Sequence, residues 1–223
     1  RGDNAPIMSI KHQISNIKNE ILDKADLIAV SKTRTIQEIK EAYKYGQLKF
    51  GENRVQEIVD KQSKLPNDIE WHMIGHLQKN KVKYIAKFIK LIHSLDRISL
   101  AIEIDKQAKK EERIINCLIQ IKISNEDSKF GLKIEDFRDF YKSLQTYENI
   151  NIIGLMGMAT FTNDIELINE EFKMIKKIYD EIASIDPKFK VLSIGMSDDY
   201  NIALKNGSNM IRIGSKIFGK RNY

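Results

Sequence analysis

The stretch LIAVSKTRTIQEIKEAYKYGQLKFGEN, residues 27–53, decides the fold class because it follows the order strand, helix, strand. An apolar run opens it at 27–32, apolar residues recur every three or four positions in its middle, and a second short run closes it at 49–53. Thr35 is a typical first residue of a helix, and Gly46 is typical of the position just beyond one. Two strands joined by a helix in this way predict a parallel βαβ unit.

The same alternation repeats along the rest of the chain. Helical apolar spacing returns between the strands, and Asp164 and Gly207 are a further expected helix start and stop. Eight βα units that close on themselves form an α/β TIM barrel, whereas an open doubly wound sheet is the competing architecture. No Gly-x-Gly-x-x-Gly follows the first strand, which favours the barrel. We expect strands at 27–32, 49–53, 70–75, 91–96, 115–123, 150–158, 190–196 and 210–215.

The chain of 223 residues has the length of one large domain, and we find no domain boundary or repeat in it. Before the first strand, apolar residues at helical spacing predict an extra helix over Met8–Lys24. Residues 1–7 read as a leader ahead of a start at Met8, so the barrel is expected over 8–223. The sequence therefore predicts a single-domain TIM barrel with one additional N-terminal helix.

Charge and cysteine content exclude several classes of protein. The 37 Lys and Arg outnumber the 31 Asp and Glu, which gives a net charge of +6. Lysines are spread over most helical segments and interleaved with Glu, so we expect a solvated surface without a nucleic-acid partner, the alternative being a working basic patch. Cys117 is the only cysteine, which excludes an internal disulfide and a Cys-based zinc cluster. With no apolar run long enough to cross a membrane, we expect a cytoplasmic protein that uses neither a membrane nor a metal.

The first strand ends in a lysine at the place where a barrel carries its chemistry. Active sites of TIM barrels lie at the carboxyl ends of the strands. Strand alternation puts Lys32 on the same face as Ile28 and Val30, so its ammonium group is expected to point into the barrel mouth. Burial disfavours a charged amine, and a neutral amine is the nucleophile for Schiff-base formation with an aldehyde. The alternative is a lysine that simply ends the strand and reaches water.

The loops after the seventh and eighth strands suit an anion. TIM barrels frequently bind phosphate there, and the two loops read GMSDDYN and RIGSKIFG. Ser197 is expected at the start of a helix, Gly214 lets backbone approach closely, and Ser215 adds a hydroxyl. Plain helix caps are the alternative for these small residues. Arg212 lies two residues before Gly214 and is expected to face the barrel interior, unless it only pairs with an acidic residue at a strand end.

Five segments together resemble one known family. They are AVSKT at 29–33, FGENRVQE at 50–57, WHMIGHLQKNK at 71–81, GLMGMA at 154–159, and LSIGMSDDYNIAL followed by IRIGSKIFGKR at 192–221. In this combination the chain resembles the pyridoxal 5′-phosphate (PLP) homeostasis proteins, the YggS-like family, from about Ile10 onward. The resemblance implies a barrel related to the N-terminal domain of alanine racemase, with PLP as the cofactor.

The resemblance also implies roles for individual residues. Lys32 matches the Schiff-base lysine, and Arg212 would face the pyridine nitrogen, where a permanent cation limits protonation of the ring. The residues expected to bind PLP are Lys32, Asn53, Met196, Ser197, Arg212, Gly214 and Ser215, with Ser197, Gly214 and Ser215 at the phosphate. His76 and Gln78 either line the mouth or serve a structural purpose.

Two functions are compatible with these features. In the first, the protein is a PLP carrier and regulator without robust catalysis, which hands PLP to apo-enzymes and acts as a monomer. In the second, it is a PLP-dependent amino-acid racemase of the alanine racemase type. Racemisation in the related two-domain enzymes needs a second base, which the resemblance places in the C-terminal domain of another subunit. We expect no such domain in this chain, because the barrel and its N-terminal helix account for the 223 residues. This expectation favours the carrier and leaves room for a weak side activity.

Overall fold

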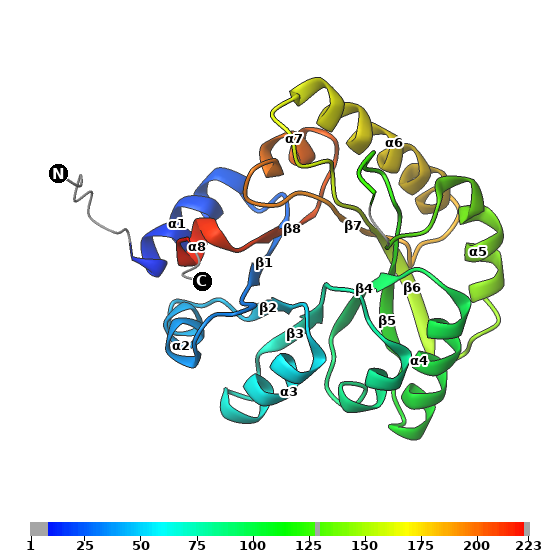
Figure 1. Cartoon of the computed structure of the whole chain (residues 1–223), viewed down its shortest axis with the longest axis horizontal. Helices are drawn as coiled ribbons and strands as arrows, with labels where there is room; N and C mark the ends of the chain where they lie inside the picture. Colours follow the sequence, from blue (N-terminus) through cyan, green and yellow to red (C-terminus); the bar gives the residue numbers. More distant parts are fainter. Residues whose placement is uncertain (1–8, 128–129, 221–223) are drawn as a thin grey trace.

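Eight parallel strands form a closed barrel in the computed structural model, which describes residues 9–127 and 130–220 (Figure 1). Each strand pairs with the next, and the ring closes where Leu27 lies opposite Ile211. The barrel prediction is therefore confirmed, and an open sheet is excluded. The strands are β1 (Asp26–Val30), β2 (Lys49–Glu52), β3 (Glu70–Met73), β4 (Leu91–Leu95), β5 (Ile115–Gln120), β6 (Ile150–Met156), β7 (Val191–Ser193) and β8 (Met210–Ile213).

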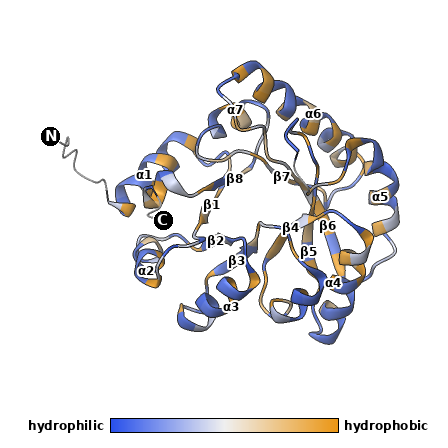
Figure 2. Ribbon diagram, in the orientation of Figure 1, coloured by the Kyte–Doolittle hydropathy of each residue, from blue (hydrophilic) through white to orange (hydrophobic). Residues whose placement is uncertain are grey.

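Helices surround the barrel on its outside (Figure 1). They carry both hydrophobic and hydrophilic residues, as expected for elements with one face on the sheet and one in solvent (Figure 2). Their bounds are α1 (Ile10–Ile21), α2 (Ile36–Lys44), α3 (Val55–Lys64), α4 (Ile98–Lys110), α5 (Phe137–Leu144), α6 (Ile165–Ala183), α7 (Tyr200–Lys205) and α8 (Ser215–Phe218), with 3₁₀ turns η1 (Lys79–Tyr84) and η2 (Ile134–Asp136). The 3₁₀ turn η1 stands between β3 and β4 in place of an α-helix.

The additional N-terminal helix is α1, which packs against α2 and α8 (Figure 1). Ser9 caps it by accepting a hydrogen bond from the His12 amide, and Leu22 ends it in the left-handed conformation at φ 47°. The helix is shorter than the range expected from Met8, which lies outside the described residues together with the expected leader at 1–7. No helix in the described part of the chain is long and apolar enough to cross a membrane.

The core has two parts, one on each side of the barrel wall. The larger part lies between the strands and the helices and includes Leu27 and Ala29 of β1. The smaller part fills the barrel interior and consists of Ile28, Leu91, Leu118, Met156 and Met210. Neighbouring residues of β1 thus face opposite sides, as a strand requires. The side chains at every second position after Ile28 therefore face the barrel interior and lie progressively closer to its mouth.

Several helix boundaries follow the expected chemistry. Thr35 caps α2 in a capping box with Glu38, and the Asp164 side chain accepts the Leu167 amide at the start of α6. Gly46 and Gly207 follow α2 and α7 with φ of 96° and 89°, a conformation that glycine adopts without strain.

The expected strands all occur, but each ends one to three residues earlier than the sequence pattern indicates. Beyond its true end each strand leaves the sheet, and the chain continues in a loop or, at Ser215, in α8. Four polar residues between the true and the expected ends lie at the barrel mouth: Lys32, Asn53, Lys122 and Ser215.

Candidate functional site

A pocket of about 1680 Å³ opens at the carboxyl ends of the strands. This volume exceeds the roughly 300–1,000 Å³ of typical ligand pockets, so a small phosphorylated ring would fit with room to spare. The seven residues expected at the cofactor all line it: Lys32, Asn53, Met196, Ser197, Arg212, Gly214 and Ser215. The fold thus brings together residues that follow β1, β2, β7 and β8 with Arg212, which lies within β8.

Lys32 lies in a turn directly after β1 and is half-buried. Strand β1 ends at Val30, so the expectation that the strand runs through Lys32 is wrong. The expected orientation is nevertheless confirmed, because Val30 and Lys32 both line the pocket. The next residue, Thr33, has φ of 65°. This left-handed conformation is a true outlier for a β-branched residue.

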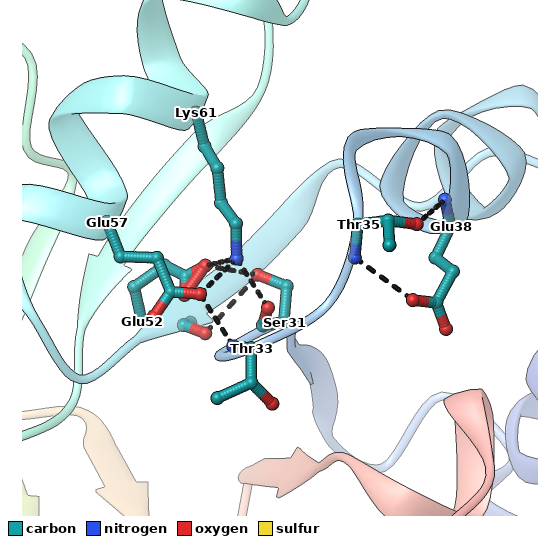
Figure 3. A network of polar contacts seen from close by, with 8 residues as sticks. Ser31, Thr33, Thr35, Glu38, Glu52, Glu57 and Lys61 are labelled. Atoms are coloured by element: carbon teal, nitrogen blue, oxygen red, sulfur yellow. Dashed lines mark hydrogen bonds and ion pairs between the residues drawn. The ribbon is translucent and has the colours of Figure 1, made fainter. Parts of the chain in front are cut away.

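A buried polar cluster lies behind this turn, between β2 and α3 (Figure 3). Lys61 Nζ lies 2.5 Å from Glu52 Oε1 and 2.6 Å from Glu57 Oε2, and it also donates to the Ser31 carbonyl oxygen at 2.6 Å. The Thr33 amide donates to Glu57 Oε2 at 2.5 Å, and the Ser31 hydroxyl donates to Glu52 Oε1 at 3.1 Å. Burial raises the pKa of Glu52 to about 7, against the opposing charge and hydrogen bond of Lys61.

Arg212 is buried inside the barrel at the pocket floor, as expected from its register with Met210. Its guanidinium donates to the carbonyl and hydroxyl oxygens of Ser193 at 2.8 and 2.5 Å, and to the Gly157 carbonyl oxygen at 3.0 Å. Burial lowers the pKa of Arg212 to about 10, with a smaller opposing effect from the charge of Asp199. Arg212 therefore stays protonated at neutral pH. Its hydrogen bonds go to neutral groups, so the alternative, an ion pair with an acidic residue at a strand end, is not what the structure has.

Two histidines continue the hydrogen bonding from Arg212 through the barrel interior. Ser193 Oγ lies 3.1 Å from His93 Nδ1, and His93 Nε2 lies 2.9 Å from His72 Nδ1. Burial lowers the pKa of His72 to about 3 and that of His93 well below its usual value, so both rings are neutral at pH 7. We call this set, from His72 through His93 and Ser193 to Arg212, the interior chain.

The guanidinium of Arg212 determines in which direction the hydrogen bonds of the interior chain are donated. A guanidinium only donates, so Ser193 Oγ accepts from Arg212 and directs its own proton to His93. His93 then donates through Nε2 to His72, whose remaining proton lies on Nε2. That atom is buried and has no hydrogen-bond partner among the described residues. A buried water is the usual acceptor for such a group.

The expected phosphate residues lie together at one side of the pocket. Ser197 is in the turn before α7, and Asp199 occupies the N-cap position, so the expectation that Ser197 starts the helix is wrong. Ser215 is the first residue of α8. A Cβ on Gly214 would make only an ordinary 3.4 Å contact with Val30, so packing in the protein does not itself require glycine there.

Gly195 does not line the pocket, but it shapes the backbone beside it, a role that the sequence pattern did not reveal. Its φ is 105°, and a Cβ there would lie 2.8 Å from the Ala203 Cβ. Its carbonyl oxygen accepts the Arg212 amide at 2.9 Å. Glycine at this position therefore lets the chain after β7 approach α7 closely and leads it to the turn that contains Ser197.

His76 also lines the pocket, whereas Gln78 is exposed and is not among the lining residues. The His76 ring stacks on Phe130 with 4.0 Å between ring centres. Burial and the charge of Arg97 lower the pKa of His76, so the ring is predominantly neutral at pH 7. Phe130 belongs to the loop after β5, and its ring and that of His76 together form one flat side of the pocket.

The donor set fits a small phosphorylated aldehyde. It combines a primary amine, two hydroxyl groups beside a glycine, and a fixed guanidinium at the floor of one pocket. An amine can bond an aldehyde carbon, hydroxyl and backbone N–H groups can bind phosphate, and a permanent cation can face a ring nitrogen.

Comparison with known proteins agrees with this geometry. The family described as alanine racemase, N-terminal domain, matches residues 7–222. A pyridoxal phosphate homeostasis protein of Pasteurella multocida is 37% identical, over 96% of this chain and 94% of that protein. The chain belongs to the alanine racemase N-terminal domain family and, within it, to the pyridoxal phosphate homeostasis proteins.

Solved structures give the same result. PipY of Synechococcus elongatus, solved with PLP bound, has a TM-score of 0.86 and 31% identity, and the match covers 95% of this chain and all of PipY. Alanine racemase from Streptomyces lavendulae has a TM-score of 0.75 at 14% identity, and the match covers 96% of this chain but 57% of the racemase. The second likeness shows the shared barrel only.

Proposed function

We propose that this protein binds PLP in the pocket at the barrel mouth, holds it through a covalent bond to Lys32, and acts in PLP homeostasis without robust turnover. The observation that carries this proposal is the convergence of Lys32, Arg212 and the two serines on one pocket. The likeness to pyridoxal phosphate homeostasis proteins and to PLP-bound PipY supports it further.

Each residue has a defined task in this proposal. PLP supplies an aldehyde that condenses with primary amines. Lys32 provides the amine, and the hydroxyls of Ser197 and Ser215 with the backbone at Gly214 bind the phosphate. Arg212 keeps its own proton and so disfavours a proton on the ring nitrogen that faces it. Asn53 and Met196 border the ring.

A weakly protonated ring suits storage better than catalysis. Reactions at an amino acid's α-carbon draw electrons into the pyridine ring, and an unprotonated ring nitrogen is a poor electron sink. A racemase also needs a second base on the opposite face of the ring. Conversion of L-alanine to D-alanine that Lys32→Ala abolishes would favour the racemase alternative over the carrier.

The cellular setting is part of the proposal. We place the protein in the cytoplasm as a monomer that hands PLP to apo forms of PLP-dependent enzymes. The free thiol of Cys117 is compatible with a reducing compartment. Size-exclusion chromatography and transfer of PLP from the loaded protein to a pure apo-enzyme test the monomer and the carrier separately.

A titration with PLP followed in the visible range tests the binding site. The protein is expected to gain an absorption band that borohydride abolishes, and Lys32→Ala is expected to lack that band. The double variant Ser197→Ala with Ser215→Ala should form the bond but release PLP more readily. Unchanged PLP affinity in the double variant would place the phosphate elsewhere. A wild-type protein that is colourless once unbound PLP has been removed would refute the proposal.

A further inference from the structure

A buried ion cluster stands directly behind the turn that carries Lys32. It consists of Glu52, Glu57 and Lys61, and we call it the Lys61 cluster (Figure 3). The side chains of Lys61 and Glu52 are 5% and 0% exposed. Burying such charges is costly, and packed apolar residues often stabilise a fold as well or better. Fold stability alone therefore explains this cluster poorly.

The Lys61 cluster holds the backbone on both sides of Lys32. Lys61 Nζ donates to the carbonyl oxygen of Ser31, and Glu57 accepts from the amide of Thr33. The first contact fixes the peptide group before Lys32, and the second fixes the peptide group after it. These two groups together define the position and direction of the Lys32 Cα–Cβ bond.

The turn needs such support because Thr33 is strained. Its φ of 65° is unfavourable for a β-branched side chain. Strained residues persist where the surrounding structure over-determines them, and they gather at functional sites. The hydrogen bond from the Thr33 amide to Glu57, which itself pairs with the buried Lys61, supplies this restraint.

None of the three members of the Lys61 cluster lines the pocket. We propose that Glu52, Glu57 and Lys61 are positioning residues, which hold the Ser31–Thr33 turn so that the Lys32 amine meets the aldehyde of PLP in a reactive geometry. This inference rests on the proposed function. It predicts that damage to the cluster slows formation of the covalent bond while the rest of the ligand site is retained.

Two ligands separate these effects. PLP can bond to Lys32, whereas pyridoxamine 5′-phosphate has an amine in place of the aldehyde and can only bind non-covalently. In Glu57→Ala, we expect the stopped-flow rate of covalent PLP capture to fall about tenfold or more, since small displacements of a reacting group have large effects on rate. The dissociation constant for pyridoxamine 5′-phosphate should stay within about twofold of wild type, because phosphate and ring contacts remain.

Two further variants and one control complete the experiment. Glu57→Gln keeps an oxygen for the Thr33 amide, so it should recover most of the capture rate. Lys61→Met removes the centre of the cluster and is used only if it folds. Lys64→Ala removes an exposed ion pair with Asp60 on the same helix, where both side chains are more than half exposed, and should change neither ligand's binding.

The outcomes are distinct. An unchanged capture rate in Glu57→Ala would overturn the inference, and so would an equal loss of binding for both ligands, which indicates general damage to the site. No covalent capture by the wild-type protein would refute the proposed function instead. Slow capture with intact pyridoxamine 5′-phosphate binding and rescue by Glu57→Gln would support the positioning role.

Discussion

The two most deeply buried cations near the pocket, Lys61 and Arg212, are held in opposite ways. Lys61 lies outside the barrel wall between the carboxylates of Glu52 and Glu57. Arg212 lies inside the barrel, and its hydrogen bonds go to neutral oxygens of Ser193 and Gly157. The ion pairs of the described residues do not include Arg212.

In the proposed site, this difference separates the support of Lys32 by Lys61 from the recognition of the ligand by Arg212. The charge of Lys61 is neutralised by its neighbours, so its effect on the pocket passes through the backbone around Lys32. The charge of Arg212 is not neutralised by a paired carboxylate, so its field reaches the pocket floor. Neutral histidines below Arg212 fix its position without cancelling its charge.

Removal of Lys61 is expected to have the largest effect on stability. Lys61→Met leaves Glu52 buried beside an apolar side chain, and breaking a buried ion pair typically costs about 3–5 kcal/mol of unfolding free energy. The loss should be smaller at acid pH, where Glu52 can protonate. Urea denaturation at pH 5.5 and pH 8 measures both values, and equal losses at the two pH values would contradict the arrangement of the cluster.

Removal of Arg212 should cost less stability and change the ligand more. Arg212→Met loses hydrogen bonds to neutral groups and leaves Ser193 without its donor, which is worth about 1–3 kcal/mol. In the same variant the ring nitrogen of bound PLP should protonate more readily, so the visible spectrum should change with pH near neutrality. A greater loss of stability in Arg212→Met than in Lys61→Met would contradict the assignment of structural support to Lys61 and of ligand contact to Arg212.

The smallest expected effect is the loss of stability in acid that His72 causes. Burial lowers the pKa of His72 to about 3, so the unfolded chain takes up protons below pH 6.5 while the folded chain does not, and stability falls with acid. This loss is about 1 kcal/mol between pH 7 and pH 5.5 for one histidine.

Glu52 has the reverse sign. Its pKa is raised from 4.5 to about 7, so its contribution to stability is complete below pH 4.5 and is lost as pH rises through 7. His72→Phe should therefore make stability less dependent on pH below 6.5, although His93 keeps part of the acid dependence. Glu52→Gln should make stability rise more, or fall less, with pH between 5 and 7. A change of the same sign in both variants would contradict the opposite titration of the two regions.

Much of the barrel mouth could be predicted from sequence because strand alternation is local. Residues at every second position of β1 and β8 share a face, so Ile28 and Met210 correctly indicated that Lys32 and Arg212 point inward. The expected helix start at Ser197 was wrong because the turn after Gly195 places the N-cap two residues later, at Asp199.

The supporting contacts could not be predicted, because they join residues distant in the chain. Lys61 contacts the Ser31 carbonyl across 30 positions, and Ser193 contacts His93 across 100. One signal was present for the first contact: Val55, Ile58 and Lys61 follow the buried stripe of α3 at spacings of three. A lysine within such an apolar stripe indicates a buried partner.

Identification of the modified lysine tests the role of Lys32 most directly. Lys122 and Lys220 also line the pocket, so a yellow protein alone does not identify the reacting amine. The protein is loaded with stoichiometric PLP, reduced with borohydride, digested and analysed by mass spectrometry. We predict one reduced PLP adduct on the peptide that contains Lys32, whereas an adduct on Lys122 or Lys220 with Lys32 unmodified would contradict the assignment.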